Sequence, residues 1–224
     1  MCGRFTQTAS PAVIAQEFGV TVSPLFTPRY NIAPSQPVAA IRIEPGTTIR
    51  QLVQLRWGLI PSWANDPKIG HQCINAKAET VAEKPSFRAA FKARRCLVIA
   101  TGFYEWQVQG KAKQPVWVGL KSHRPFAFAG LWEQWQPPDG AVIESCTILT
   151  TDPNELLQPI HNRMPVILSP ASYDQWLDPT VQQAASLQAL LRPYPSEELT
   201  AYPVSTLVNN PRHDAPDCLE PLPV

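Results

Sequence analysis

Short stretches of apolar and β-branched residues, each about the length of one strand, recur at intervals of roughly 8–15 residues through this chain. Many short strands at such a spacing are typical of an antiparallel sheet or barrel. We therefore predict an α+β fold with a barrel-like, mostly antiparallel β-sheet core and peripheral helices. The candidate strands are residues 38–43, 49–57, 96–100, 104–108, 115–120, 125–135, 145–151 and 200–205.

Helices and turns fill the intervals between these strands. Ser10 can cap a helix whose first turn accommodates Pro11 and which Gly19 can end. Residues 78–94 have a helical composition that Pro85 should interrupt. Further helices are expected at 170–177 and 182–191, a proline-rich irregular loop at 24–37, and turns at 44–48, 109–113 and 137–140. Because no repeat or low-complexity linker divides the chain, residues 1–224 are interpreted as a single domain.

The composition indicates a folded protein rather than a disordered chain. Hydrophobic residues make up 44% of the chain and charged residues 17%. We see neither a signal peptide nor an apolar run of the roughly 20 residues that span a bilayer, so a reducing, cytoplasmic location is expected. The five cysteines include no C-x-x-C pair, which indicates neither a disulfide framework nor a zinc site. Cys96 and Cys146 lie in apolar runs and are interpreted as core thiols.

The formal net charge of +1 conceals a strong asymmetry along the chain. Residues 1–124 hold 16 basic and 6 acidic side chains, a net of +10, and residues 125–224 hold 3 and 12, a net of −9. A basic half could attract a phosphate backbone. Equally, the two halves could pair with each other across one core, and charge alone does not separate these interpretations.

Cys2 is the most unusual residue of the sequence. Because its side chain is small, an aminopeptidase that removes Met1 should leave Cys2 with a thiol and a free α-amine. An α-amine has a pKa near 8, so a sizeable neutral fraction exists at neutral pH and can attack an aldehyde to form a Schiff base. The thiol can then close onto the imine carbon to give a thiazolidine. The ordinary alternative is an N-terminal cysteine packed into a strand.

Three further stretches hold candidate catalytic residues. Asn75 and Lys77 are two residues apart in an extended segment, so both should point the same way. Glu105 lies between two aromatic residues, surroundings that can raise the pKa of a carboxyl group and let it give or take a proton. His161 lies in a loop bracketed by prolines. Each has an ordinary explanation as well: a turn for Asn75, an ion pair for Glu105, a satisfied loop histidine for His161.

Seven motifs, in this order, resemble the SOS-response-associated peptidase (SRAP) family of abasic-site processing proteins. The resemblance extends over nearly the whole chain and implies one α+β domain built around a barrel-like sheet. It also implies a covalent crosslink to abasic sites in single-stranded DNA, a role in the DNA damage response and a location at DNA. The motifs are MCGRF, RYNIAPSQPV, WGLIPSW, INAKAET, GFYEW, PIHNRMPVIL and YPVSTLVNN.

The resemblance also implies roles for individual residues. Cys2 would form the crosslink after Met1 is removed, and Asn75 would hold Cys2 and the sugar by hydrogen bonds. Glu105 would be the general acid and base, and His161 would protonate or stabilise the ring-opened sugar oxygen. No cofactor or metal is implied, and the four histidines lack ligand spacing.

DNA contacts follow from the same motifs. The candidates for phosphate contacts are Arg4, Arg29, Lys77 and Arg163, those for base stacking are Trp63 and Trp106, and those for the pocket floor are Pro34 and Thr150. Stacking is worth about 1–3 kcal/mol per base and tolerates any sequence. The family usually has arginine at Lys77, and lysine lacks the bidentate fork, so we expect weaker or less oriented DNA binding there.

Three alternatives remain open at the level of sequence. The first is a thiol peptidase or autopeptidase using Cys2, although only Met1 precedes it here. The second is a non-covalent single-stranded-DNA-binding module, which would need neither Cys2 nor Glu105. The third is abasic lyase activity, in which the Schiff base leads to β-elimination. The partner is expected to be single-stranded DNA with abasic sites, the protein a monomer without membrane contact, and any replication-fork partner is unknown.

Overall fold

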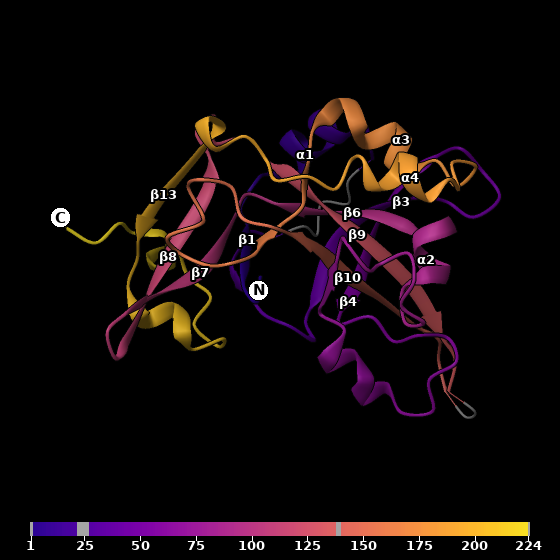
Figure 1. Ribbon diagram of the computed structural model, residues 1–224, viewed down its shortest axis with the longest axis horizontal. Helices are drawn as coiled ribbons and strands as arrows, with labels where there is room; N and C mark the ends of the chain where they lie inside the picture. Colours follow the sequence, from indigo (N-terminus) through magenta and orange to yellow (C-terminus); the bar gives the residue numbers. More distant parts are fainter. Residues whose placement is uncertain (1, 22–26, 138–139, 224) are drawn as a thin grey trace.

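A computed structural model describes residues 2–21, 27–137 and 140–223 of the chain, which form two β-sheets with short helices around them (Figure 1). Parts of the expected loop at 24–37 and of the turn at 137–140 lie outside the described residues. The expectation of irregular structure is wrong for residues 29–32 of that loop, which form a strand because they pair with residues 5–7. The strands are β1 Phe5–Gln7, β2 Arg29–Ile32, β3 Pro37–Ile43, β4 Arg50–Trp57, β5 Asn75–Lys77, β6 Arg95–Ala100, β7 Gly102–Gln109, β8 Ala112–Leu120, β9 Phe126–Trp135, β10 Ile143–Thr151, β11 Met164–Pro165, β12 Ile167–Leu168 and β13 Leu199–Pro203.

The larger sheet closes on itself. Its strands follow the order β11-β10-β4-β3-β6-β9-β12, and β10 also pairs with β9, so β10, β4, β3, β6 and β9 form a ring. The smaller sheet has the order β13-β8-β7-β1-β2. Among the described strands, parallel pairing occurs only where β10 meets β4 and β5. The expectation of an α+β fold with a barrel-like, mostly antiparallel core is confirmed.

Alternate residues of the ring strands face two different cores. In β6, Leu97 and Ile99 pack in a cluster that includes the helices, whereas Cys96 and Val98 pack in one that includes the smaller sheet. Successive side chains of a strand point to opposite faces, so strands covered on both faces read as continuous apolar runs. This explains why the strands were visible in the sequence, and both predicted core thiols, Cys96 and Cys146, have no exposed surface.

The first helix, α1 Pro11–Phe18, has the ends that its sequence predicts. Its Ser10 cap accepts a hydrogen bond from the backbone N–H of Val13, and Gly19 ends it at φ +64°, a left-handed conformation that glycine adopts readily. The aromatic ring of Phe18 stacks on that of Tyr173 at 5.5 Å, which packs α1 against α3.

The other helices are shorter than their composition predicts. Only α2 Arg88–Ala93 forms within 78–94, because residues 78–87 are held in turns such as the hydrogen bond from Glu83 N–H to the Thr80 carbonyl. The two late helices shrink to α3 Tyr173–Leu177 and α4 Ala184–Gln188. Short 3₁₀-helices are η1 Pro67–Gln72, η2 Pro170–Ser172, η3 Ser196–Glu198, η4 Thr206–Asn209 and η5 Pro216–Leu219. No helix among the described residues is long and apolar enough to cross a membrane.

Several ion pairs join the basic half of the chain to its acidic half. They link Arg29 with Asp214, Arg42 with Glu144, Arg50 with Asp174 and Arg94 with Glu133. These pairs support the interpretation that much of the charge asymmetry is neutralised within the fold.

Candidate functional site

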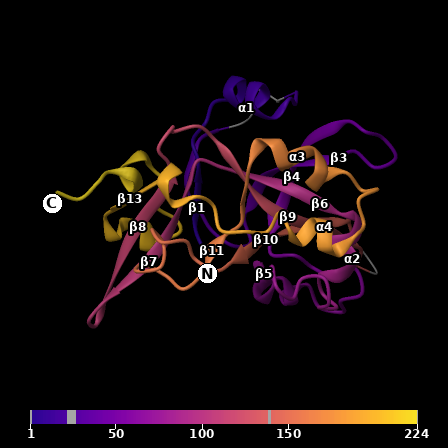
Figure 2. The same ribbon diagram turned by 45° about the horizontal axis from the view of Figure 1, so that its top comes forward.

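The four predicted catalytic residues come from four separate segments that meet where the two sheets adjoin. Cys2 precedes β1 and Glu105 lies on β7, both in the smaller sheet, whereas Asn75 lies on β5 and His161 in the loop between β10 and β11 of the larger sheet. Figure 2 shows the N-terminal end of the chain beside β7, β10 and β11. The site is therefore assembled by tertiary structure and not by one local motif.

Cys2 is held by its main chain with its thiol buried. The side-chain amide of Asn75 donates a hydrogen bond of 2.8 Å to the Cys2 carbonyl oxygen. The Cys2 residue has no exposed surface, and burial followed by the nearby charge of Glu105 raises the pKa of its thiol well above the ordinary value. The sulfur is therefore kept as a neutral thiol, which is a poor nucleophile until a base removes its proton.

Asn75 is positioned by the parallel pairing of β5 with β10. In this register Asn75 lies opposite Ile148 and Lys77 opposite Thr150. On the preceding side, the indole N–H of Trp57 donates to the Ile74 carbonyl at 2.8 Å. The Asn75 Oδ1 atom is buried without a hydrogen-bond partner among the described residues, so this oxygen can accept a hydrogen bond from a bound group.

Glu105 is a buried carboxyl group on β7. It is 2% exposed, and burial raises its pKa from 4.5 to about 7. Strand alternation places its side chain on the same face as that of Phe103, while Tyr104 and Trp106 point to the other face. The burial thus comes from the packing of the two sheets, not from the flanking aromatic residues. Near neutral pH the group is partly protonated, so it can donate or accept a proton.

The Nε2 atom of the His161 ring faces the Glu105 carboxyl group. Its Nε2 lies 3.9 Å from Glu105 Oε2, and its Nδ1 accepts a hydrogen bond of 3.1 Å from the backbone N–H of Arg163. Nδ1 also lies 3.3 Å from the Arg163 carbonyl oxygen, to which the other tautomer would donate. When Nδ1 accepts from the Arg163 N–H, the neutral ring carries its proton on Nε2, toward Glu105. Burial, the largest cause, lowers the pKa of His161 below its ordinary value. Near neutral pH the histidine is therefore a neutral hydrogen-bond donor to the site.

Three of the predicted phosphate contacts are arginines that already have protein partners. Arg163 donates to both carboxylate oxygens of Glu79 at 2.9 Å and to Asp152 at 2.9 Å. Arg29 forms an ion pair with Asp214. A phosphate reaching either guanidinium would compete with a carboxylate that is already bound to it.

Arg4, the third arginine predicted to contact phosphate, is anchored beneath the aromatic side chain of Trp106. Its Nη1 donates to Asn31 Oδ1 at 2.8 Å and to the Val208 carbonyl at 2.7 Å, and its guanidinium lies 5.9 Å from the centre of the Trp106 ring. The Trp106 indole N–H donates to Asn209 Oδ1 at 2.7 Å. Arg4 and Trp106 are therefore held as one unit on the face of β7 opposite to the Glu105 side chain.

The other four residues predicted to contact DNA differ in how far they are exposed to solvent. Lys77 is exposed at the end of β5, and Trp63 is 58% exposed in the loop after β4. Thr150 is fully buried, and its carbonyl accepts a hydrogen bond of 2.7 Å from Arg163. Pro34 is half-buried in a turn before β3. The structure brings Lys77, Thr150 and Arg163 together at one rim of the site, and no described contact joins Trp63 to the four catalytic candidates.

Sequence reasoning missed the residues that hold the predicted ones in place. Asn31 and Asn209 orient Arg4 and Trp106, and both lie in motifs that were quoted without a role for them, RYNIAPSQPV and YPVSTLVNN. Polar side chains inside a motif otherwise made of apolar and turn residues were the available signal. Glu79 likewise lies in a quoted motif, INAKAET, but its partner Arg163 is 84 residues away, so the sequence did not pair them. Asp152 lies outside the quoted motifs.

Three comparisons place the chain among known proteins. Residues 1–211 match the family model described as SOS response associated peptidase (SRAP). The abasic site processing protein YoqW of Bacillus subtilis (strain 168) is 46% identical over 224 residues, which cover 98% of this chain and 99% of that protein. The abasic site processing protein HMCES of Xenopus tropicalis is 34% identical, over 87% of this chain and 66% of that protein. A crystal structure of a Bacteroides thetaiotaomicron protein superimposes with a TM-score of 0.87 at 28% identity, covering 99% of this chain and 100% of that one.

Proposed function

Because the chain belongs to the SOS response associated peptidase (SRAP) family, we propose that it processes abasic sites in single-stranded DNA by forming a covalent crosslink through Cys2. The proposal takes its substrate from the names of the relatives, which are abasic site processing proteins. The observation that carries it is the arrangement at Cys2: Asn75 holds the Cys2 carbonyl, while Glu105 and His161 lie beside it. No step of this chemistry requires a metal or a redox cofactor.

The first step opens the sugar and forms an imine. Removal of Met1 frees the α-amine of Cys2, and the Nε2–H of His161 donates a hydrogen bond to the ring oxygen as the abasic deoxyribose opens to its aldehyde. The amine attacks the aldehyde carbon to give a carbinolamine. The protonated carboxyl of Glu105 then donates a proton to the departing hydroxyl, and one water molecule leaves as the C=N bond of an N-protonated imine (an iminium ion) forms.

The second step closes the ring. Glu105, now a carboxylate, accepts the thiol proton of Cys2, and the sulfur attacks the imine carbon. The nitrogen keeps the proton that it carried in the iminium ion, and Glu105 is protonated again as at the start, so in sum the S–H group has added across the C=N bond without any oxidant or reductant. A carboxyl group with a pKa of about 7 suits both steps, since it must donate a proton in the first and accept one in the second.

Intact mass spectrometry tests the proposal. The purified protein is incubated with single-stranded DNA that carries one abasic site, then denatured and weighed. We expect loss of the Met1 mass and an adduct with the mass of the DNA less one water, absent in Cys2→Ala and present in the matched control Cys73→Ala, whose thiol is also buried. Trimmed protein that binds this DNA but never gains the adduct would refute the proposal.

The same samples separate the alternatives. Cleavage of the strand without a stable adduct would indicate the lyase reaction, in which the imine undergoes β-elimination. Equal binding by wild type and Cys2→Ala, with neither adduct nor cleavage, would indicate a non-covalent binding module. Cleavage of an added peptide that depends on Cys2 would indicate a thiol peptidase.

A further inference from the structure

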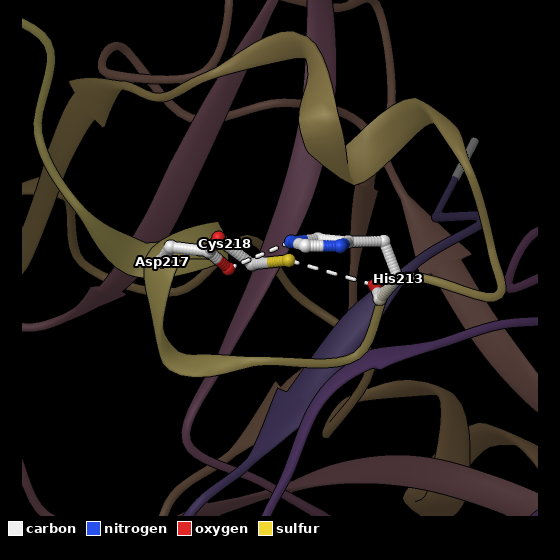
Figure 3. Close-up of side chains that lie close together, drawn as sticks. All are labelled: His213, Asp217 and Cys218. Carbon is white, nitrogen blue, oxygen red and sulfur yellow. Dashed lines mark hydrogen bonds and ion pairs between the residues drawn. The ribbon is translucent and has the colours of Figure 1, made fainter.

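A histidine, an aspartate and a cysteine converge near the C-terminus, away from the crosslinking site. His213 Nε2 lies 2.7 Å from Asp217 Oδ1. One ring nitrogen of His213, one carboxylate oxygen of Asp217 and the Cys218 sulfur all lie within 4.8 Å of one another (Figure 3). Within residues 2–21, 27–137 and 140–223, this is the one group of three such side chains close enough to share an ion. None of the three has a part in the proposed crosslinking reaction.

The turn that carries these residues is anchored to the core. The His213 carbonyl accepts a hydrogen bond of 2.6 Å from the Asn31 side chain, and the Cys218 carbonyl accepts one of 3.3 Å from the Tyr104 hydroxyl. Within the turn, the Cys218 N–H donates to the Ala215 carbonyl at 3.0 Å. The main chain on both sides of the group is therefore fixed by residues of β2 and β7, so the donor atoms do not depend on a loose terminal segment for their placement.

The donor set is one that zinc prefers. A thiolate, an imidazole and a carboxylate together suit Zn²⁺ or Co²⁺, whereas Mg²⁺ and Ca²⁺ take oxygen ligands. From ordinary zinc bond lengths, donors at a tetrahedral ion are about 3.4–3.6 Å apart. The separations in the group, from 2.7 Å to no more than 4.8 Å, lie on either side of that value. Small side-chain rotations would therefore place an ion between them.

We propose that His213, Asp217 and Cys218 bind one zinc-class divalent ion, with a water molecule in the fourth position. Asp214 is the nearby carboxylate that could have completed the set, but it binds Arg29 and the backbone N–H groups of Tyr30 and Asn31. The side chains of His213 and Asp217 are 31% and 39% exposed, which gives the ion and its water a path from solvent. On binding, the Cys218 thiol releases its proton to solvent and loses the 3.6 Å hydrogen bond that it donates to the His213 carbonyl oxygen. The His213–Asp217 hydrogen bond is replaced by two metal bonds.

Such an ion would tie the C-terminal segment to the sheet that carries the DNA-binding candidates. The same segment supplies the Val208 carbonyl to Arg4 and the Asn209 side chain to Trp106. Binding to the folded state alone would stabilise the protein in proportion to the logarithm of the free metal concentration.

Cobalt and zinc binding by the full chain tests the site. All proteins carry Cys2→Ala, because an N-terminal aminothiol can itself chelate metal. After treatment with a chelator, we expect one Co²⁺ per chain with a sulfur-to-cobalt charge-transfer band in the near ultraviolet, and a rise in melting temperature when Zn²⁺ is added. Elemental analysis should give one zinc per chain.

Variants locate the ligands. Cys218→Ser should remove the charge-transfer band. Asp217→Asn keeps a hydrogen-bonding partner for His213 but should lower the affinity for Zn²⁺ by more than about 100-fold. The controls His71→Gln and Cys73→Ser should bind as before. If Cys218→Ser fails to fold, His213→Gln gives the same test at a partly exposed position. No stoichiometric metal in the Cys2→Ala protein, or equal binding by the ligand variants and the controls, would overturn the proposal, and neither result would bear on the crosslink.

Discussion

The Glu105 carboxyl group is buried, so its ionised form lowers the stability of the folded protein. Its pKa is about 7 in the folded protein and near 4.5 when exposed, so the folded state binds the proton more tightly. For a pKa raised by folding, the stability is greatest at low pH and is lost as the pH rises from about 4.5 through 7. Above pH 7 the ionised group lowers the free energy of unfolding by at most about 3 kcal/mol, from 1.36 kcal/mol per pKa unit.

We therefore expect Glu105→Gln to be more stable than wild type at pH 8, by up to about 3 kcal/mol, and nearly equal to it at pH 4.5. The same variant should form the crosslink at least about 100-fold more slowly. The wild-type rate should decline above pH 7, where the Glu105 carboxyl can no longer donate a proton, and the variant should not show this decline. Urea unfolding at the two pH values and quenched crosslinking assays measure both effects.

Glu133→Gln is the matched control for this change. Glu133 is also a buried glutamate, but it has an ion-pair partner in Arg94. Its substitution should lower stability at pH 8 and leave the crosslinking rate unchanged. A Glu105→Gln protein no more stable than wild type at pH 8 would contradict the assignment of Glu105 as a strained, functional carboxyl.

At the scale of the elements, apolar runs predicted the longer strands, and Ser10 and Gly19 predicted the ends of α1, because these signals are local. The short strands β1, β2, β11 and β12 were not predicted, because pairing with distant segments defines them. The two-residue spacing of Asn75 and Lys77 likewise placed both on one short strand, β5. The parallel pairing of β5 with β10 had no local signal, and that pairing brings Asn75 to Cys2. Helical composition failed over residues 78–87 because tertiary packing favoured turns over a marginal helix.

The loop after β4 presents an exposed aromatic side chain that the core does not need. Trp63 is 58% exposed, so Trp63→Ala should fold normally and lose a base-stacking surface. Stacking worth about 1–3 kcal/mol predicts a 5- to 150-fold weaker affinity for single-stranded DNA. Fluorescence anisotropy with an undamaged oligonucleotide, in a Cys2→Ala background, measures binding without the covalent step.

Ile49→Ala controls for the loss of an exposed apolar surface. Ile49 is 62% exposed and precedes β4, at the opposite end of that strand from the Trp63 loop. Its substitution should leave the affinity unchanged. If both variants bind as well as wild type, Trp63 is not a stacking residue.

For the whole molecule, the site depends on how the two sheets pack against each other. Phe128 of the larger sheet contacts Phe5 at 5.7 Å and Phe103 at 6.0 Å between ring centres, and both partners lie on strands of the smaller sheet near Cys2 and Glu105. The partners of the arginines at the site are likewise distant in sequence, 84 residues for Arg163 and Glu79. Motifs could therefore name the catalytic candidates, but not the packing and charge pairing that set their geometry.

We expect Phe128→Leu to lower both stability and the rate of crosslinking. The loss of stability should be about 1–3 kcal/mol, and the rate per folded molecule should fall at least 10-fold because small displacements of reacting groups are costly. Phe91→Leu is the matched control, since Phe91 is equally buried but packs on Trp176 in the cluster that includes the helices. It should lose similar stability and keep its rate within about twofold. Equal rate losses would show that the interface between the sheets has no special role.

The pairing of β5 with β10 has a consequence for how this protein can change. The segment of residues 64–73, which includes η1, leads directly into Asn75, yet β10 and the Trp57–Ile74 hydrogen bond hold the strand that follows it. Exchanges at its exposed positions, residues 65, 66, 68, 71 and 72, can alter its charge while the amide that holds Cys2 keeps its place. Selection, or a designer with a library of such segments, can therefore change the surface charge next to the candidate site without moving the residues to which the proposed reaction is assigned.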